Sequence, residues 1–201
     1  LSQRDVPIIS IWNYQQDATI TCLGSDNHQA GSIVTEHILS RGHKDIAFLF
    51  PETTNNDRAR NRREGAMRAI EASGLNLPEE RIITCGYNIE TAKRITRQLL
   101  NDNPPTAIIC GNDVIARGAI YACHAENIPV PEKISIVGIG DFTGSSSMEP
   151  GLTTVRFHAR KIGKLAADVI VNMSETGFDP SPFSQKVDLS IYDRGSTRRL
   201  N

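Results

Sequence analysis

The sequence predicts an α/β fold with a doubly wound parallel sheet, and three observations support this prediction. Runs with strand composition alternate along the 201 residues with runs of helical spacing. The strand runs are continuously apolar rather than alternately apolar and polar, as is typical of parallel strands covered on both faces. The hydrophobic fraction of 39% and the net charge of -1 are ordinary for a globular protein whose core is large enough for such a sheet.

The first half of the chain contains these signals in regular order. A β-rich run at 6–12 predicts a buried strand. After 18–26 the apolar residues change to helical spacing, and Gly42 follows the last helical turn. Strands are then expected at 45–50 and 81–85, and helices at 61–74 and 88–102.

The second half continues the alternation. Strands are expected at 105–111, 135–140, 152–157 and 186–195, and helices at 112–127 and 159–177. Ligands of an open parallel sheet bind outside the carboxyl ends of its strands. Polar side chains follow several of these strand ends, and we expect them to converge on one edge of the sheet. They are Tyr87, Asn112, Asp113, Asp141 and the arginines that follow 45–50.

Several function classes lack the sequence pattern that their chemistry needs. No GxGxxG follows a strand and no GxxxxGKS or GxxxxGKT is present, so neither a dinucleotide site nor a P-loop is supported. Serines at 145–147 and His158 are present, but no GxSxG turn accompanies them. The histidines show no HExxH or similar metal spacing. We therefore expect no enzyme activity, no cofactor and no metal.

Composition restricts the partners in the same way. The near-neutral charge argues against a large nucleic-acid footprint on these residues. No run of about eighteen apolar residues is present, so we expect no membrane span. The four cysteines are not closely paired. Small buried residues in a reducing cytoplasm are the favoured interpretation, with a disulfide or a metal site as the alternative.

Charged and aromatic side chains provide candidate binding groups. A cluster of arginines at 58–63 lies between an expected strand and an expected helix. It forms either a solvated basic loop or a clamp for an anion or a polyol. Trp12 and Tyr87 each follow a strand, where an aromatic ring either packs at the rim or stacks under an apolar ligand face.

Four blocks of sequence occur in order between Val6 and Arg198. They read "SDNHQAGSIVTEHILSRGHKDIAFLF", "PTAIICGNDVIARGAIYACHAENIPVPEKISIVGIGDF", "EPGLTTVRF" and "DRGSTR". These blocks resemble the effector-binding domain of the lactose/galactose repressor family (LacI/GalR). The resemblance implies a periplasmic-binding-protein-like fold of type I. In that fold two Rossmann-like subdomains clasp a small effector, and the chain crosses between them three times.

The resemblance also implies that part of the family's architecture is missing from this chain. Family members carry a helix-turn-helix DNA-binding head and a hinge before the two subdomains, so we expect a chain truncated at its N-terminus. The C-terminal subdomain is expected to be complete, at 23–156 and 185–197. Segments 1–22 and 157–184 are expected to form a remnant of the N-terminal subdomain.

The family's site residues are carried over position by position. Its effector-binding arginine falls on Arg62, three positions before the glycine of the helix. Its stacking aromatic residue falls on Tyr87, and the asparagine of its ANDxxA motif falls on Asn112. The other residues expected to bind effector are Trp12, Asp113, Asp141 and Phe157.

Position 140 departs from the family pattern. Members often have two successive aspartates here, the first of which accepts hydrogen bonds from sugar hydroxyls, whereas this chain has Gly140 before Asp141. A neutral polyol would then lose a bidentate acceptor, while the charge of Arg62 is kept for the ligand. We therefore hypothesise an anionic effector, such as a sugar acid or a sugar phosphate.

Together these features predict the effector-sensing part of a bacterial transcriptional regulator, most simply a repressor. The resemblance implies a cytoplasmic homodimer that binds a small-molecule effector and reaches operator DNA only through the missing head, with no membrane partner. A sugar-binding protein of a transport system has the same fold and is the alternative. An enzyme on this fold is a third reading, and it would require turnover that Asp141→Asn abolishes.

Overall fold

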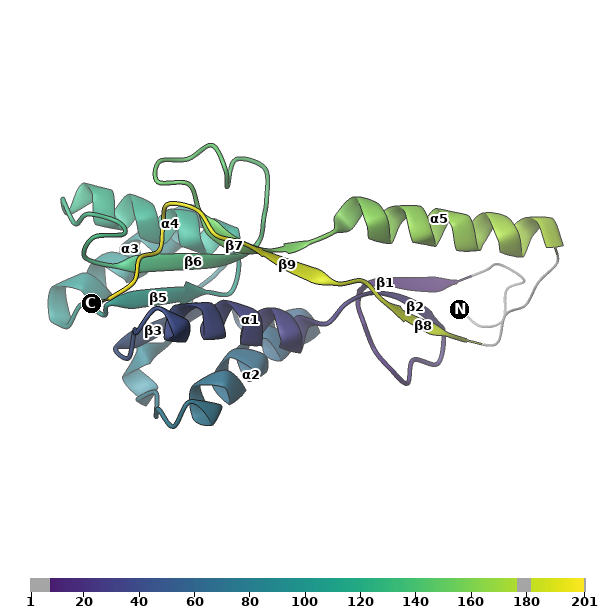
Figure 1. Ribbon diagram of the computed structural model, residues 1–201, viewed down its shortest axis with the longest axis horizontal. Helices are drawn as coiled ribbons and strands as arrows, with labels where there is room; N and C mark the ends of the chain where they lie inside the picture. Colours follow the sequence, from purple (N-terminus) through teal and green to yellow (C-terminus); the bar gives the residue numbers. More distant parts are fainter. Residues whose placement is uncertain (1–7, 177–181, 201) are drawn as a thin grey trace. The chain divides into compact units, whose positions relative to one another are not determined.

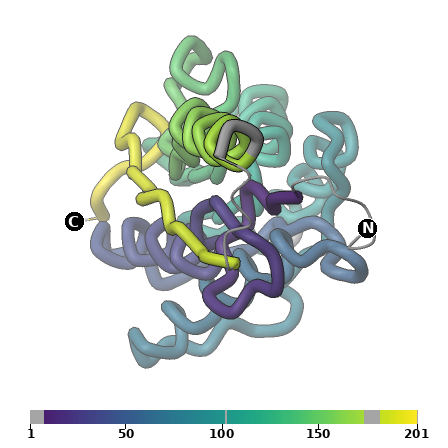
Figure 2. The backbone as a smooth tube through the Cα atoms, turned by 90° about the vertical axis from the view of Figure 1, so that its right-hand side faces the viewer, coloured from purple at the N-terminus to yellow at the C-terminus, as the bar shows by residue number. Residues whose placement is uncertain are grey.

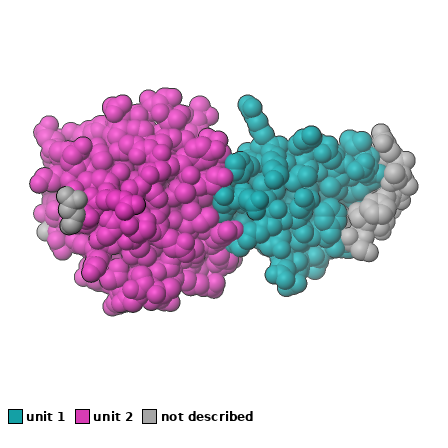
Figure 3. Space-filling view, in the orientation of Figure 1, with its two compact units in different colours: residues 1–27, 157–189 teal, residues 28–156, 190–201 magenta. Residues whose placement is uncertain are grey.

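The computed structural model describes residues 8–176 and 182–200 of the chain. The chain forms two compact units, which are coloured separately in Figure 3. Unit 1 contains residues 1–27 and 157–189, and unit 2 contains residues 28–156 and 190–201. The chain therefore passes from one unit to the other after 27, after 156 and after 189. The assignment of the two units to the family's N-terminal and C-terminal subdomains stays a prediction.

Unit 2 contains the doubly wound parallel sheet that the sequence predicts. Its strands are β3 (Ile46–Phe50), β4 (Ile82–Thr84), β5 (Ala107–Cys110), β6 (Ser135–Gly140), β7 (Thr153–Phe157) and β9 (Leu189–Tyr192). The last residue of β7 and the first residue of β9 are counted with unit 1. The strands lie in the order β4-β3-β5-β6-β7-β9; Figure 1 labels all of them except β4. Strand β3 pairs in parallel with β4 and β5, and β6 pairs in parallel with β5 and β7. Every residue of β3 and β5 is buried, because these strands lie inside the sheet and helices cover both of its faces.

Two layers of helices enclose this sheet. The helices are α1 (Asn27–Ser40), α2 (Asp57–Ala72), α3 (Ile89–Asp102) and α4 (Asp113–Ala125). Figure 1 shows α1 and α2 on one face and α3 and α4 on the other. A short 3-10 turn, Glu79–Arg81, leads into β4.

Glycines allow the helices of each face to pack closely. A Cβ atom at Gly31 in α1 would lie 1.9 Å from the carbonyl oxygen of Arg62 in α2. A Cβ atom at Gly118 in α4 would lie 2.4 Å from the Cβ atom of Ala92 in α3. A larger residue at either position would push the paired helices apart. The close packing therefore fixes where the N-terminal turns of α2 and α4 lie at the sheet edge.

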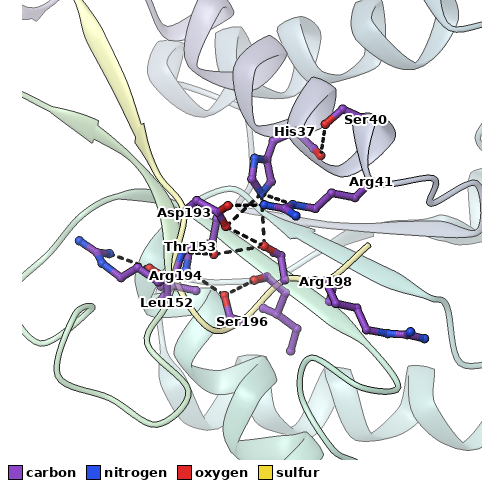
Figure 4. Close-up of polar contacts among 12 residues, drawn as sticks. His37, Ser40, Arg41, Leu152, Thr153, Asp193, Arg194, Ser196 and Arg198 are labelled. Atoms are coloured by element: carbon purple, nitrogen blue, oxygen red, sulfur yellow. Dashed lines mark hydrogen bonds and ion pairs between the residues drawn. The ribbon is translucent and has the colours of Figure 1, made fainter. Parts of the chain in front are cut away.

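The C-terminal segment after β9 is fastened to α1 and to the sheet of unit 2 (Figures 2 and 4). The Arg41 guanidinium pairs with the Asp193 carboxylate. The backbone N–H of Leu200 donates to the carbonyl oxygen of Arg41 at 2.8 Å. His37 Nε2 lies 3.2 Å from Thr197 Oγ1 in the same network. The described part of the segment after β9 is thus fastened to unit 2 by side-chain and backbone contacts.

Unit 1 contains a smaller parallel sheet. Its strands, in spatial order, are β1 (Ile9–Asn13), β2 (Thr21–Ser25) and β8 (Ser184–Lys186). Helix α5 (Ala159–Thr176) packs against β1 and β2. Among the residues that the structure describes, no helix is both long and apolar enough to span a lipid bilayer.

Two sequence predictions in these regions are wrong. The run at 6–12 does form a strand within its described part, but Ile11 and Trp12 are 43% and 40% exposed because β1 lies at the edge of its sheet; residues 6 and 7 lie outside the described residues. The single strand expected at 186–195 is divided between two sheets. The N–H of Val187 donates to the carbonyl oxygen of Gly24 at 2.7 Å in unit 1, whereas β9 lies beside β7.

The cysteines occupy the core as small apolar residues. All four are buried and free: Cys22, Cys85, Cys110 and Cys123. Burial raises the pKa of the Cys123 thiol to about 12 and raises that of Cys110 well above its ordinary value. The interpretation of the cysteines as small buried residues is therefore confirmed.

Candidate functional site

A pocket of about 410 Å³ opens at the carboxyl end of the sheet in unit 2. Its lining comes from the segments that follow four strands adjacent in the sheet, β4, β3, β5 and β6. Parallel strands bring their following turns to one edge, as the sequence predicts. The lining residues are Asn55, Asn56, Asp57, Arg58, Arg62, Tyr87, Asn112 and Phe142.

Helix α2 supplies the arginines of this pocket. It begins at Asp57, four residues before the start that the sequence predicts at 61, so all the arginines at 58–63 lie on the helix. The side chain of Asn56 caps the helix by accepting a hydrogen bond from the N–H of Ala59 at 3.1 Å. The carboxylate of Asp57 in the first turn also favours an early start, because negative charge is stabilised at a helix N-terminus.

Arg62 projects from the second turn of α2 toward the turn after β5. Its Nη1 donates to the carbonyl oxygen of Gly111 at 3.1 Å. Burial lowers the pKa of the Arg62 guanidinium to about 10, and the nearby Tyr87 and Asp113 oppose this effect. The guanidinium therefore keeps its positive charge at neutral pH in a poorly hydrated position. A charge in such a position interacts strongly with an opposite charge on a ligand.

Tyr87 presents an aromatic ring whose hydroxyl is held. Asn56 Nδ2 donates to Tyr87 Oη at 3.1 Å, while Asn56 Oδ1 accepts from the helix backbone. Both ends of the Asn56 amide are therefore engaged. The Tyr87 side chain is 50% exposed, so it offers an apolar face at the pocket wall.

Asn112 caps the N-terminus of α4 and lines the pocket at the end of β5. Its Oδ1 accepts from the N–H of Ile115 at 3.0 Å, and the residue is buried. The next residue, Asp113, is fully buried and turns away from the pocket. It accepts hydrogen bonds from Thr154 Oγ1 at 2.6 Å, from Ser145 Oγ at 2.7 Å and from the N–H of Phe142 at 2.8 Å.

The Asp113 carboxyl organises the turn after β6 from behind the pocket. Burial raises the pKa of this carboxyl, and the hydrogen bonds from Thr154 and Ser145 oppose the effect. Gly138 in β6 makes room for it, because a Cβ atom there would lie 2.4 Å from Asp113 Oδ1. Asp113 thus holds the backbone of Phe142 in place.

Gly140 and Asp141 give this turn an unusual backbone. Gly140 has a φ of +139° and Asp141 a φ of +52°. A Cβ atom at Gly140 would lie 2.5 Å from the ring of Phe142. Only glycine combines this conformation with this close contact. The family often has an aspartate at this position. In this chain the Phe142 ring covers the space that a side chain at Gly140 would need.

The carboxylate of Asp141 is engaged inside unit 2. Its Oδ1 accepts from Arg194 Nη2 at 2.8 Å, and its Oδ2 accepts from Arg156 Nε at 2.5 Å. Only 5% of the Asp141 side chain is exposed. The Arg156 guanidinium in turn lies 3.7 Å from the centroid of the Tyr192 ring.

Residues 35–197 match the family described as the periplasmic binding protein-like domain. The chain belongs to this family. Among its relatives, the probable HTH-type transcriptional repressor ExuR of Bacillus subtilis (strain 168) is 28% identical over 203 residues, covering 100% of this chain and 60% of the relative. The HTH-type transcriptional repressor PurR of Proteus mirabilis (strain HI4320) is 32% identical over 179 residues, covering 86% of this chain and 52% of the relative.

A solved structure of a transcriptional regulator has the same fold. A LacI family transcriptional regulator from Silicibacter pomeroyi is 27% identical, with a TM-score of 0.84 over 95% of this chain and 69% of that one. The resemblance to the lactose/galactose repressor family is thereby confirmed, together with the predicted fold class. The chain spans 60% and 52% of the lengths of the two repressors, so it corresponds to part of such proteins.

The structure brings together three of the residues that the family resemblance implies. Arg62, Tyr87 and Asn112 line one pocket. Asp113 and Asp141 lie behind that lining, each held by donors of the same unit. The two remaining residues, Trp12 and Phe157, belong to unit 1. Contacts of all these residues with an effector stay predictions.

Other lining residues were missed by reasoning from the sequence. The run Asn55, Asn56 and Asp57 carries a signal that could have found it, because asparagine and aspartate are preferred where a helix begins. Phe142 carries no such signal. Its place in the pocket depends on the positive φ angles of the two residues before it.

Proposed function

We propose that this chain is the effector-binding part of a bacterial transcriptional repressor, and that its effector binds in the pocket of unit 2. The observation that carries the proposal is the meeting of Arg62, Tyr87 and Asn112 at one pocket from three different strand ends. In the family that the sequence resembles, the matching positions bind the effector. The repressor relatives ExuR and PurR support the repressor part of the proposal.

The size and lining of the pocket suit a small polar ligand. A volume of about 410 Å³ falls in the range of about 300–1,000 Å³ that is usual for small-molecule sites. Amide groups of Asn55, Asn56 and Asn112 line it together with the half-exposed rings of Tyr87 and Phe142. Sugars present both hydroxyls and apolar C–H faces, which match amides and aromatic rings respectively.

The charge of the lining favours an anionic ligand. The N-termini of α2, α3 and α4 each carry an acidic residue in the first turn, which offsets the positive end of the helix dipole. The charged lining residues are therefore the deciding ones. The lining contains two arginines, Arg58 and Arg62, and one acidic residue, Asp57, which leaves a positive balance of charge. We infer a sugar acid or a sugar phosphate, because the guanidinium fork binds carboxylates and phosphates in a bidentate manner.

The regulatory part of the proposal extends beyond this chain. A DNA-binding head outside the chain would read the operator, and a homodimer in the cytoplasm would present two such heads to a two-fold operator. The effector would act by binding one arrangement of the protein better than another. The size of the regulatory effect is limited by that difference in affinity.

The effector class is tested by thermal unfolding of this chain with matched ligands. Glucose, glucuronate and glucose 6-phosphate share one ring and differ in charge. A ligand at a hundredfold excess over its Kd stabilises the folded state by about 2.7 kcal/mol, so a binder raises the Tm measurably. We expect the acids to raise the Tm more than the neutral sugar does, and the same order in other sugar series. Equal shifts for acids and neutral sugars would contradict the anionic effector.

A further inference from the structure

The turn after β6 connects a pocket residue directly to a buried carboxylate. Phe142 lines the pocket, and Asp141 is its neighbour in a turn with two successive positive φ angles. The ring of Phe142 lies over Gly140, so Gly140, Asp141 and Phe142 pack tightly together. Phe142 and Asp141 are adjacent in this turn, so a shift of the Phe142 backbone acts directly on Asp141.

Asp141 is held by two arginines from distant parts of the chain. Oδ2 accepts from Nε of Arg156 at 2.5 Å, with a second contact from Nη2, and Oδ1 accepts from Nη2 of Arg194 at 2.8 Å. Tyr192 completes the cluster, because its hydroxyl accepts from Arg156 Nη1 at 2.7 Å. A buried carboxylate of this kind either carries its partners with it when it moves or loses one of them at a large cost.

The two arginines lie beside two of the points where the chain changes units. Arg156 is the last residue of unit 2 before the chain enters unit 1 at Phe157. Tyr192 and Arg194 follow the return of the chain to unit 2 at Ser190.

The segment around Arg194 is anchored. As Figure 4 shows, its side chain reaches the Leu152 carbonyl oxygen, with Nη1 at 2.6 Å. Its N–H donates to Thr153 Oγ1 at 2.9 Å. One carboxylate thus joins the pocket turn to the segments at 152–156 and 190–194.

We propose that Asp141 is a positioning residue that couples the pocket, through Phe142, to the two segments at which the chain leaves and re-enters unit 2. The inference rests on the proposed function, since it concerns the regulation of the same pocket. It gives Asp141 a role different from the direct effector contact that the family resemblance implies. In this role the carboxylate transmits a change at Phe142 to Arg156 and Arg194, which a purely static ion pair would not do.

The coupling is tested without any ligand, by hydrogen exchange measured by mass spectrometry on this chain. Phe142→Ala perturbs the pocket end of the path, and Asp141→Asn removes the carboxylate charge at nearly constant shape. We expect each substitution to raise the exchange rate of amides in 153–157 and 190–194 several-fold. We expect the double variant to exchange there no faster than Asp141→Asn alone, because the path is already broken.

A matched control separates coupling from general loosening. Asp45→Asn removes the partner of another arginine, Arg81, at the opposite end of the sheet, and it should leave both segments unchanged. Two results would overturn the proposal and leave Asp141 as a local ion pair. One is an exchange rate in the double variant that equals the product of the two single effects. The other is an unchanged exchange rate in 153–157 and 190–194 after Phe142→Ala. If Asp141→Asn does not fold, Arg156→Lys replaces it under the same criteria, because lysine keeps the charge but not the two-nitrogen contact. Failure of effector binding would not affect this test.

Discussion

Arg62 donates a hydrogen bond from Nη1 to the carbonyl oxygen of Gly111 at 3.1 Å. This contact joins the second turn of α2 to the turn after β5, where Asn112 caps α4. Side chains that follow different strands are thereby held in one arrangement by the protein itself. Such preorganisation lowers the entropic cost of binding a ligand.

Replacing Asn112 should separate its role as the N-cap of α4 from its role in the pocket lining. Asn112→Ala removes the N-cap of α4 and should lower the free energy of unfolding by about 0.5–2 kcal/mol. Asn88→Ala removes the equivalent cap of α3, where Oδ1 accepts from the N–H of Thr91 at 3.0 Å, and should cost a similar amount. Asn88 does not line the pocket. Urea unfolding should therefore show comparable losses of stability in the two variants. Only Asn112→Ala should weaken the binding of sugar acids. Equal affinities for sugar acids in the two variants would contradict the role of Asn112 in the pocket.

Gly140 should not tolerate a side chain. Gly140→Ala places a Cβ atom 2.5 Å from the Phe142 ring at a φ of +139°, and we expect a loss of about 1–3 kcal/mol in the free energy of unfolding. Gly86→Ala is the matched control, because a Cβ atom there meets nothing within 4 Å. It should change stability by no more than about 0.5 kcal/mol. A Gly140→Ala variant as stable as Gly86→Ala would show that the turn is not constrained as described.

His37 should make the stability of the chain fall at acidic pH. Its Nε2 accepts a hydrogen bond from Arg41 Nε at 2.8 Å, so the folded protein holds the ring neutral. Burial lowers the pKa of His37 below its ordinary value of 6.5, Arg41 and His43 add to the effect, and Asp193 opposes it. Below pH 6.5 the His37 ring of the unfolded chain binds a proton that the folded chain excludes. This contribution to stability is therefore complete above pH 6.5 and is lost as the pH falls toward the folded-state pKa.

The measurement for His37 is urea unfolding at several pH values between about 7.5 and 5. His37→Gln keeps an acceptor for Arg41 and cannot be protonated, so its stability should depend less on pH over this window. His124→Gln removes an exposed histidine of α4 and is the control. An unchanged pH dependence in His37→Gln would refute the assignment.

Much of the fold could be predicted because the relevant signals are local. The runs that became β3, β5 and β6 are continuously apolar, and each is followed by helical spacing. Arg62, Tyr87 and Asn112 follow strand ends, and a parallel sheet brings such positions to one edge. Right-handed crossovers restrict the possible strand orders of such a sheet to a few.

The remaining features depend on contacts between distant residues. Nothing local in the run 186–195 indicates that its first part bonds to Gly24 and its second part lies beside β7. The partners of Asp141 are Arg156 and Arg194, and their pairing follows only from the folded sheet. The early start of α2 has another reason, since the sequence predicts the helix from 61 although Asn56 caps it at Asp57.

The central claim is tested most directly by titrating this chain with the sugar acid or sugar phosphate that stabilises it most, and by repeating the titration with two arginine variants of α2. Arg62→Ala removes a charged hydrogen-bonding group worth about 1.5–3 kcal/mol, so affinity should fall by about 10- to 100-fold. Arg68→Ala removes an exposed arginine from the same helix outside the pocket and should leave affinity unchanged. Full affinity in Arg62→Ala, or equal losses in both variants, would contradict the assignment of the effector to this pocket.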